Sequence, residues 1–278
     1  RDELAADVEE FGDARRTRLV EREAATALEE TELTPSEPVT VVLSENGWVR
    51  VAKGHEVDPE TFTYRSGDGF LAAAQGRSNQ SALFFDSTGR AYWVAVHTLP
   101  SARGHGEPLS GRLNLPGGAS VCALAMGADD DLLLLASDLG YGFIARLGDL
   151  QTRNRAGKAA LNVGKGGTML PVSRVMETSQ QRIAVVSNAG RLLVFATDDL
   201  PQMARGRGVK LAALKGDAQE RLVGSVSLRM DQALTLHAGN RHLTLKPDDL
   251  AAYAGVRGRR GKTLPRGFQR VSGIRAAG

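Results

Sequence analysis

The sequence predicts an all-β domain whose five similar blades form a propeller-like disc, preceded by a short helical segment. The main observation is a unit of two apolar strands, joined by a four-residue turn and followed by a loop of Arg, Gly and Lys, which occurs five times. Successive turns are 42, 51, 50 and 50 residues apart, a spacing typical of propeller arrays. With 278 residues, 42% of them hydrophobic and 32 of them Gly, the chain can bury one sizeable core and supply many turns.

The N-terminal part has the apolar spacing of helices rather than the strand pattern of the repeats. Leu4, Val8 and Phe11 recur at helical spacing, and a second helical stretch is predicted over residues 19–30. The segment TPSEP then ends any helix, because each proline restricts the residue before it. An amphipathic helix that packs on the disc edge is the alternative to a piece of an upstream domain. The predicted organisation is a helical tail of an upstream domain (1–33), a linker (34–38) and the disc (39–278).

Within each unit the first strand, the turn and the second strand follow directly, which is typical of short hairpins. The first strands are expected at 39–43, 82–85, 132–135, 183–186 and 233–236. The second strands are expected at 48–51, 92–96, 141–145, 192–196 and 242–245. We expect a positive φ at the closing residue of each turn, because Gly tolerates it freely and Asn better than most. These closing residues are Gly47, Gly89, Gly140, Gly190 and Asn240.

An apolar residue follows ten positions after each turn. In the last three units an acidic residue precedes it, so we expect short helical or turn segments that the acid caps and the apolar side chain anchors. The five anchors are Val57, Leu99, Leu150, Leu200 and Leu250.

The loops after the anchors carry the predicted chemistry. They span 65–71, 103–109, 155–161, 205–211 and 258–264, and each ends at a Leu that we expect to begin the next strand. Glycine allows close backbone approach, and the planar guanidinium of Arg matches phosphate geometry. Loops repeated around one disc would form a basic track along its rim, suited to a curved polyanion. The candidate DNA-binding residues are Arg103, Arg155, Lys158, Arg205, Arg207, Lys210, Arg257, Arg259, Arg260 and Lys262.

The distribution of charge supports this interpretation. Residues 1–38 carry a net charge of −7 and residues 39–278 a net charge of +10, and the last 28 residues contain no acid. A single such loop is more simply a solvated turn, but its recurrence in register favours a binding surface. Readout of base sequence is not expected, since no recognition helix or zinc finger is present and aromatic residues make up only 5%.

Several other kinds of site are excluded by spacing. The segment GKT at 261–263 lacks the first glycine of a phosphate-binding loop, because Val256 occupies that position. The five His residues are scattered and Cys122 is the single cysteine, so no metal site is expected. The acidic run 129–131 is more simply a solvated turn than a pair of catalytic carboxylates, and no catalytic residue is predicted.

Localisation is predicted from two further absences in the sequence. No run of eighteen apolar residues suggests a membrane-spanning helix. The single cysteine, which we expect to be a buried core residue, cannot form an internal disulfide. A chain without disulfides is consistent with a location in the reducing cytoplasm.

Phrases along nearly the whole chain resemble the C-terminal part of the A subunit of bacterial DNA topoisomerase IV, in the gyrase A family. The matching phrases are EFGDARRTRLVERE (10–23), VTVVLSENGWVRVAKGHEVD (39–58), FDSTGRAY (85–92), TLPSARGHGEPLSGRL (98–113), ASDLGYGF (136–143), NRAGKA (154–159) and RGRRGKTLPRGFQR (257–270). The resemblance implies a five-bladed β-pinwheel, a disc in which neighbouring blades exchange strands. The sequence leaves two forms open, a closed disc and a disc broken between the first and last blades, and a gap is suggested by unit one, which is shorter and has the least basic loop.

The resemblance further implies binding and bending of double-stranded DNA that is not sequence-specific. The whole enzyme would be an A2B2 assembly of two A and two B subunits that uses ATP and Mg²⁺ for strand passage in decatenation, relaxation and chromosome segregation. A chromosome condensin is a further candidate partner, and nucleoid association is expected. Tyr64, Tyr92, Tyr141 and Tyr253 do not match the motif of the DNA-cleaving tyrosine, so this fragment is expected to have no cofactor and to be catalytically silent alone.

Three alternatives remain at this point. The resemblance to gyrase A is weaker, because its box of Gln, Arg, Arg, Gly, Gly, Lys and Gly is missing and the equivalent loop, 64–70, has Asp68 where gyrase would have a cation. A protein-interaction propeller would require an exposed apolar patch. A self-contained enzyme would require polar groups that converge at the disc centre, which the uniformly apolar first strands do not suggest.

Overall fold

The computed structural model describes residues 1–12, 36–216 and 219–277, which divide into an N-terminal unit and the β-domain. Helix α1 (Asp2–Phe11) ends at Gly12, as the pattern predicted, and all of its side chains are exposed. The predicted helix at 19–30 and the first two linker residues lie outside the described residues. The assignment of the N-terminal unit to an upstream domain therefore stays a prediction. The described residues include no helix long and apolar enough to cross a membrane.

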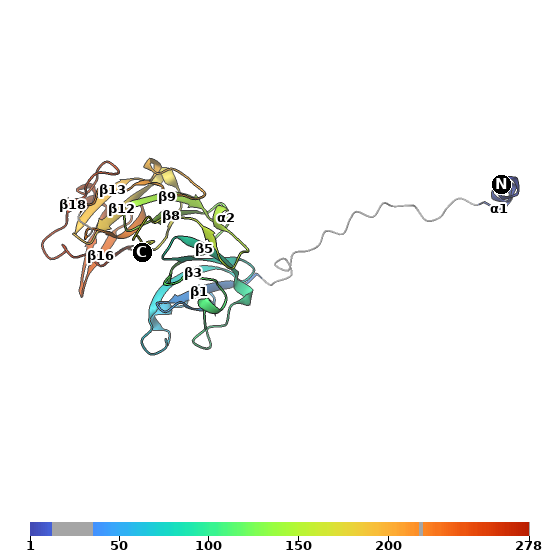
Figure 1. Ribbon diagram of the computed structural model, residues 1–278, viewed down its shortest axis with the longest axis horizontal. Helices are drawn as coiled ribbons and strands as arrows, with labels where there is room; N and C mark the ends of the chain where they lie inside the picture. The colour runs from blue at the N-terminus through green and yellow to red at the C-terminus, as the bar shows by residue number, and fades with distance from the viewer. Residues whose placement is uncertain (13–35, 217–218, 278) are drawn as a thin grey trace. The chain divides into compact units, whose positions relative to one another are not determined.

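The β-domain consists of five antiparallel sheets, one for each predicted blade. In Figure 1 the blades follow one another in an arc from β1 through β5, β9 and β13 to β16. The hydrogen-bonded orders are β3-β1-β2-β6, β10-β5-β4-β7, β11-β8-β9-β14, β15-β12-β13-β18 and β17-β16-β19. The five-bladed, all-β prediction is confirmed.

The strands of the central hairpins coincide closely with the predicted ranges. These hairpins are β1 (Pro38–Ser44) with β2 (Trp48–Lys53), β4 (Ser81–Asp86) with β5 (Arg90–Ala95), β8 (Leu132–Ala136) with β9 (Tyr141–Arg146), β12 (Gln181–Ser187) with β13 (Arg191–Ala196), and β16 (Leu234–Ala238) with β17 (Arg241–Leu245). A third strand pairs with the first strand of each hairpin. These third strands are β3 (Phe70–Arg77), β7 (Val121–Ala125), β11 (Ser173–Val175), β15 (Leu222–Arg229) and β19 (Gly273–Ala276).

The turn residues mostly behave as predicted. Gly47, Gly89, Gly140 and Gly190 have φ between +65° and +85°. The prediction for Asn240 is wrong, because in the last hairpin Gly239 takes the positive φ of +58° and no described residue other than Gly has one. The left-handed conformation costs a side chain energy, and the neighbouring Gly takes it without that cost.

Neighbouring blades exchange strands. Each unit from the second to the fifth donates a two-residue strand that pairs with the second hairpin strand of the preceding blade. The third strands contact one another from blade to blade, β3 with β7, β11 with β15 and β15 with β19, so they line the centre and the donated strands form the outer edge. The donated strands are β6 (Glu107–Pro108), β10 (Lys158–Ala159), β14 (Val209–Lys210) and β18 (Lys262–Thr263).

A buried Leu follows each donated strand and anchors it. Its backbone amide donates to the carbonyl of the turn glycine in the preceding blade, as in Leu211 to Gly140 at 2.7 Å and Leu264 to Gly190 at 2.9 Å. Leu109 and Leu161 make the same bond, and all four side chains are at most 3% exposed. The expectation that these residues begin the next strand is therefore wrong for units two to five. Only Leu71 lies in the following strand, β3.

Glycine is required where a donated strand crosses onto its neighbour. Gly106 has φ +86°, and a Cβ there would lie 2.2 Å from the carbonyl oxygen of Val49. Gly208 has φ +73° and approaches the carbonyl of Gly142 equally closely. The close approach that the sequence suggested for a ligand is thus made to the preceding blade.

Short helical segments follow four of the five hairpins and end near the predicted anchors. They are η2 (Val96–Thr98), α2 (Leu147–Leu150), η5 (Thr197–Asp199) and α3 (Pro247–Ala251). Val57 is the exception, because it is only half-buried and precedes η1 (Pro59–Thr61). Of the three acid caps that the sequence predicted, only the one in α3 is confirmed, where Asp249 accepts from the amide of Lys246. Two further turns, η3 (Leu109–Gly111) and η4 (Thr178–Gln180), were not predicted.

The core lies between neighbouring sheets, because alternate residues of one strand, such as Ile183 and Ala184 of β12, enter different clusters. Each cluster of buried apolar residues draws on more than one blade, and the first also contains Leu109 of a donated segment. Cys122 in β7 is half-buried and packs against the second cluster. Burial raises the pKa of its thiol to about 12, so it is a core residue rather than a reactive thiol.

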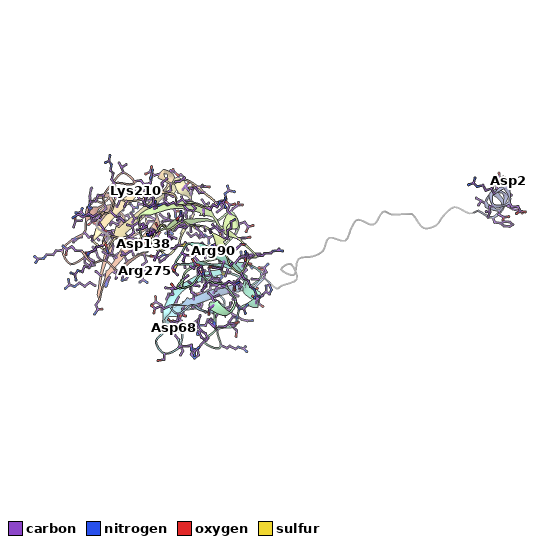
Figure 2. All side chains as sticks on the ribbon, in the orientation of Figure 1. Asp2, Asp68, Arg90, Asp138, Lys210 and Arg275 are labelled. Carbon is purple, nitrogen blue, oxygen red and sulfur yellow. The ribbon has the colours of Figure 1, made fainter. Side chains whose placement is uncertain are left out.

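The fifth blade lacks an outer strand. Its sheet has three strands, and no strand from the described part of unit one pairs with β17. Unit one passes from η1 to β3 without donating a strand, because its loop is short. Its Glu60 makes an ion pair with Arg275 of β19 at 4.0 Å, and Arg275 is labelled in Figure 2. In the described residues, no strand pairing therefore joins the first blade to the last, and the disc is open at this point.

The close contact at Gly106 provides a test of strand exchange. We expect Gly106→Ala to lower the free energy of unfolding by more than about 2 kcal/mol, because it adds a left-handed side chain and a clash with Val49. Gly104→Ala in the same loop is the matched control, since its Cβ would meet nothing within 4 Å. Urea denaturation of both variants measures the difference, and equal stabilities would contradict the assigned exchange.

Candidate nucleic-acid interface

The basic loops lie where the donated strands attach, at the outer edge of blades one to four. The sequence predicted this common edge from five loops, and the structure brings together those of units two to five in equivalent positions. The loop of unit one lies instead on its own blade, where Arg50 donates to the carbonyl of Thr63. The predicted track is thus made of four equivalent loops rather than five.

Most of the ten candidate side chains are exposed. The exposed ones are Arg103, Arg155, Arg205, Arg207, Lys210, Arg259 and Lys262. Lys158, Arg257 and Arg260 are half-buried. Within residues 36–216 and 219–277, only Arg260 of the ten is paired with a carboxylate. Nine of the ten therefore keep a positive charge that no acid in the described chain neutralises directly.

Two lysines also stabilise their own loops. The Nζ of Lys158 donates to the carbonyl of Asp149 in α2, and that of Lys262 to the carbonyl of Ala252, the residue directly after α3. The C-terminal end of a helix carries partial negative charge, so an ammonium group there is favourable. Each ammonium has three donors, and two remain for another acceptor.

Arg257 connects two loops. Its Nη1 donates to the carbonyl of Lys210 at 2.8 Å, which joins the loop of unit five to the strand that unit four donates. Its Nε is buried and has no hydrogen-bond partner among the described residues. Arg257 therefore has a structural role that the sequence pattern did not indicate.

Arg260 belongs to a buried network rather than to the open track. Its Nη2 lies 2.9 Å from Oε2 of Glu220, whose side chain is 5% exposed. Burial opposes ionisation of Glu220, but hydrogen bonds from the Lys215 amide and the Ser187 hydroxyl, together with Arg260, hold its pKa below the usual value. The stabilising pair is therefore present at neutral pH and is lost only as the pH falls through that lowered pKa.

Sequence reasoning missed the arginines that hold the loops in place. Arg90, labelled in Figure 2, donates to the carbonyls of Ala156 and Gly157 at 2.8 and 3.0 Å. Arg191 donates to the carbonyl of Gly261 at 3.0 Å. Both are the first residue after a turn glycine, and this shared position was the available signal. They fix the backbone of the loops that present the exposed cations.

Charge is unevenly distributed along the arc. Units one to three (39–177) have no net charge, whereas units four and five (178–278) carry +10. Some arginines of both parts are paired with acids, as in Arg174 with Asp131 and Arg221 with Asp138. The positive potential is therefore concentrated on the last two units.

The third strands enclose a mainly apolar hollow near the centre of the disc. This hollow of about 430 Å³ is lined mainly by apolar side chains, some of them from β3 and β7, and its one cation, Arg174, is paired with Asp131. No group of three or more His, Cys, Asp or Glu side chains in the described residues could hold a metal ion.

Tyr92 is fully buried, and its hydroxyl donates to Asp86 at 2.7 Å. Burial together with that acceptor raises the pKa of Tyr92 far above the ordinary value.

Comparisons with known proteins agree with this architecture. The family model described as the DNA gyrase C-terminal domain, beta-propeller, matches residues 131–175 and 181–227, which correspond to blades three and four. The chain is 51% identical over 278 residues to the A subunit of DNA topoisomerase 4 from Pseudomonas aeruginosa, and 46% identical over 276 residues to that of Escherichia coli K12. These alignments cover 99% and 98% of this chain but 37% and 36% of the relatives, so the chain spans little more than a third of their length.

Solved structures show the same relationship. The structure of the E. coli ParC C-terminal domain matches with a TM-score of 0.75 and 43% identity, covering 87% of this chain and 99% of that one. A DNA gyrase A C-terminal domain matches with a TM-score of 0.66 over 87% of this chain and 83% of that one, but at 17% identity it shares the fold alone. The chain belongs to the family of C-terminal domains of the DNA topoisomerase IV A subunit, within the wider gyrase A C-terminal domain family.

Proposed function

We propose that this domain binds and bends double-stranded DNA through its outer edge, without sequence preference, and guides duplex segments to a strand-passage core. The observation that carries the proposal is the equivalent placement of four basic loops on successive blades, with nine of the ten candidate cations free of carboxylate partners in the described chain. Phosphates recur at regular intervals along a duplex, and cations repeated along an arc suit such a ligand.

The distribution of charge favours a defined path for the duplex. Units four and five carry all of the net positive charge of the β-domain, so we infer that they make the dominant contacts. The first three units would extend the contact around the arc through Arg103 and Arg155, which are exposed. A duplex that follows several blades must bend, and the phosphate contacts offset the elastic cost.

The activity of the full-length protein is part of the proposal, because this chain spans little more than a third of its relatives. We propose that it acts in an A2B2 topoisomerase in the cytoplasm, associated with the nucleoid, with ATP bound by the B subunits and Mg²⁺ at the cleavage site. Decatenation, relaxation and chromosome segregation would follow from strand passage there. A condensin partner stays a prediction, as does the catalytic silence of the fragment alone.

Salt dependence provides the first test of this proposal. The 278-residue chain should bind unrelated duplexes with equal affinity, and log K should fall with log salt by roughly 0.9 for each phosphate neutralised. Gel-shift titrations of two sequences at several salt concentrations measure both quantities. An affinity that does not change with salt, or that depends strongly on sequence, would refute phosphate binding at the edge.

Adjacent arginines separate binding from stability. We expect Arg259→Gln to weaken DNA binding with little change in stability, because Arg259 is exposed. Arg260→Gln should lower the free energy of unfolding by about 1–3 kcal/mol, because it leaves the buried Glu220 carboxylate without its charged partner. Gel shifts and urea denaturation of the two variants measure the contrast. Equal effects in both measurements would contradict the different roles assigned to the pair.

A further inference from the structure

Two exposed arginines lie over aromatic rings near the outer edge of the disc. The guanidinium carbon of Arg65 is 4.3 Å from the centre of the Trp48 ring, and that of Arg207 is 3.9 Å from the centre of the Tyr141 ring. Both distances are within the range of a favourable cation–π contact. Neither arginine makes an ion pair with an acid among the described residues.

The two rings occupy equivalent positions. Trp48 and Tyr141 are the first residues of β2 and β9, directly after a turn glycine, and each lies opposite a donated strand. The residues at this position in the other blades are Arg90, Arg191 and Arg241. Arg90 and Arg191 hold backbone carbonyls of the neighbouring loops. In the first four blades the residue at this position therefore either holds a loop or lies beneath a second arginine.

The supported arginines come from different places in the chain. Arg207 belongs to the segment that unit four donates to blade three, whereas Arg65 belongs to the loop of unit one and lies on its own blade. The same arrangement thus arises from two different connections. This convergence points to the position of the guanidinium group, rather than to the loop itself, as the shared feature.

The acid beside Arg65 does not neutralise it. Oδ1 of Asp68 accepts from the backbone amides of Asn46 and Gly69, both at 2.9 Å. Burial alone would raise the pKa of Asp68, but a hydrogen bond from Ser44 and these two amide bonds hold it below the ordinary value. Asp68 occupies the position where gyrase would have a cation. Its carboxylate instead joins the loop that carries Arg65 to the turn of the first hairpin. Asp68 is labelled in Figure 2.

We propose that Arg65 and Arg207 are pre-organised phosphate-binding residues, and that Trp48 and Tyr141 are the positioning residues that hold them. The inference rests on the proposed function, since the phosphates are those of bound DNA. A ring beneath the guanidinium restricts the long side chain before binding and leaves its in-plane N–H groups free to donate. Less conformational freedom is then lost when a phosphate binds, which favours these arginines over unsupported ones.

Arg205 and Arg207 provide a matched comparison within one loop. Both are exposed, but of the two only Arg207 lies over a ring within the described chain. We expect Arg207→Gln to weaken duplex binding roughly two- to tenfold more than Arg205→Gln in gel shifts of the 278-residue chain. Each substitution should reduce the salt slope by about one. Equal losses of affinity would overturn the proposal.

Substitution of the ring tests positioning directly. Tyr141→Leu should lower affinity roughly two- to tenfold while leaving the salt slope unchanged, because the charge of Arg207 remains. Tyr141→Phe keeps a ring and should bind like the parent chain. Thermal unfolding is followed in parallel, so that only folded protein is compared. If the folded Tyr141→Leu protein binds like the parent, the positioning role is wrong.

The chain contains its own reporter for the other pair. Trp48 and Trp93 are its two tryptophans, so Trp93→Phe leaves Trp48 as the single emitter. We expect saturating duplex to change Trp48 fluorescence, and Arg65→Gln to abolish most of that change. An unresponsive Trp48 in a sample whose gel shift shows bound DNA would overturn the assignment of Arg65. A chain that binds no DNA at all would instead refute the proposed function.

Discussion

The donation of a two-residue strand from each unit to the preceding blade is the interaction on which the rest of the structure depends. Each donated strand completes a sheet, places a buried Leu in the core of its neighbour and bonds to the carbonyl of its turn glycine. Because the link is covalent on one side and packed on the other, it fixes each blade to the next. The open fifth blade follows from the same rule, since unit one has no strand to donate.

The donated segments serve the fold and the proposed interface with different atoms. Their glycines face the preceding blade, where a side chain would collide with backbone, as at Gly106 and Gly208. Their exposed arginines are in contact with solvent. Arg90 and Arg191 of the preceding blades donate to the backbone carbonyls of these loops. The geometry that joins the blades therefore also repeats the cations at regular intervals around the edge. A binding surface of this kind requires no cavity, which is consistent with the apolar centre of the disc.

The positive residues are not equivalent, although they look so in the sequence. Arg260 compensates a buried carboxylate, Arg257 joins two loops, and Arg207 lies over a ring. Burying the Glu220 carboxylate would cost much free energy if it had no charged partner. The main role of Arg260 is therefore to stabilise the fold rather than to bind DNA. Exposed cations contribute little to stability and remain available to a polyanion. The proposed function therefore depends on a subset of the basic residues, concentrated in the last two units.

Hairpins, their turns and the five-fold repeat could be predicted from the sequence, because strand alternation and turn glycines are local signals. The ten candidate cations and the loops that carry them could also be identified from the sequence, because they depend only on residue type and on recurrence along the chain. Strand exchange between blades was expected only because of the family resemblance. The residue pattern itself predicted that Leu109 and Leu264 would begin the next strand. The tertiary structure decided which blade each loop completes, that Glu220 neutralises Arg260, and that Trp48 and Tyr141 lie beneath arginines. These are contacts between residues distant in the chain or set by loop geometry, and no local pattern specifies them.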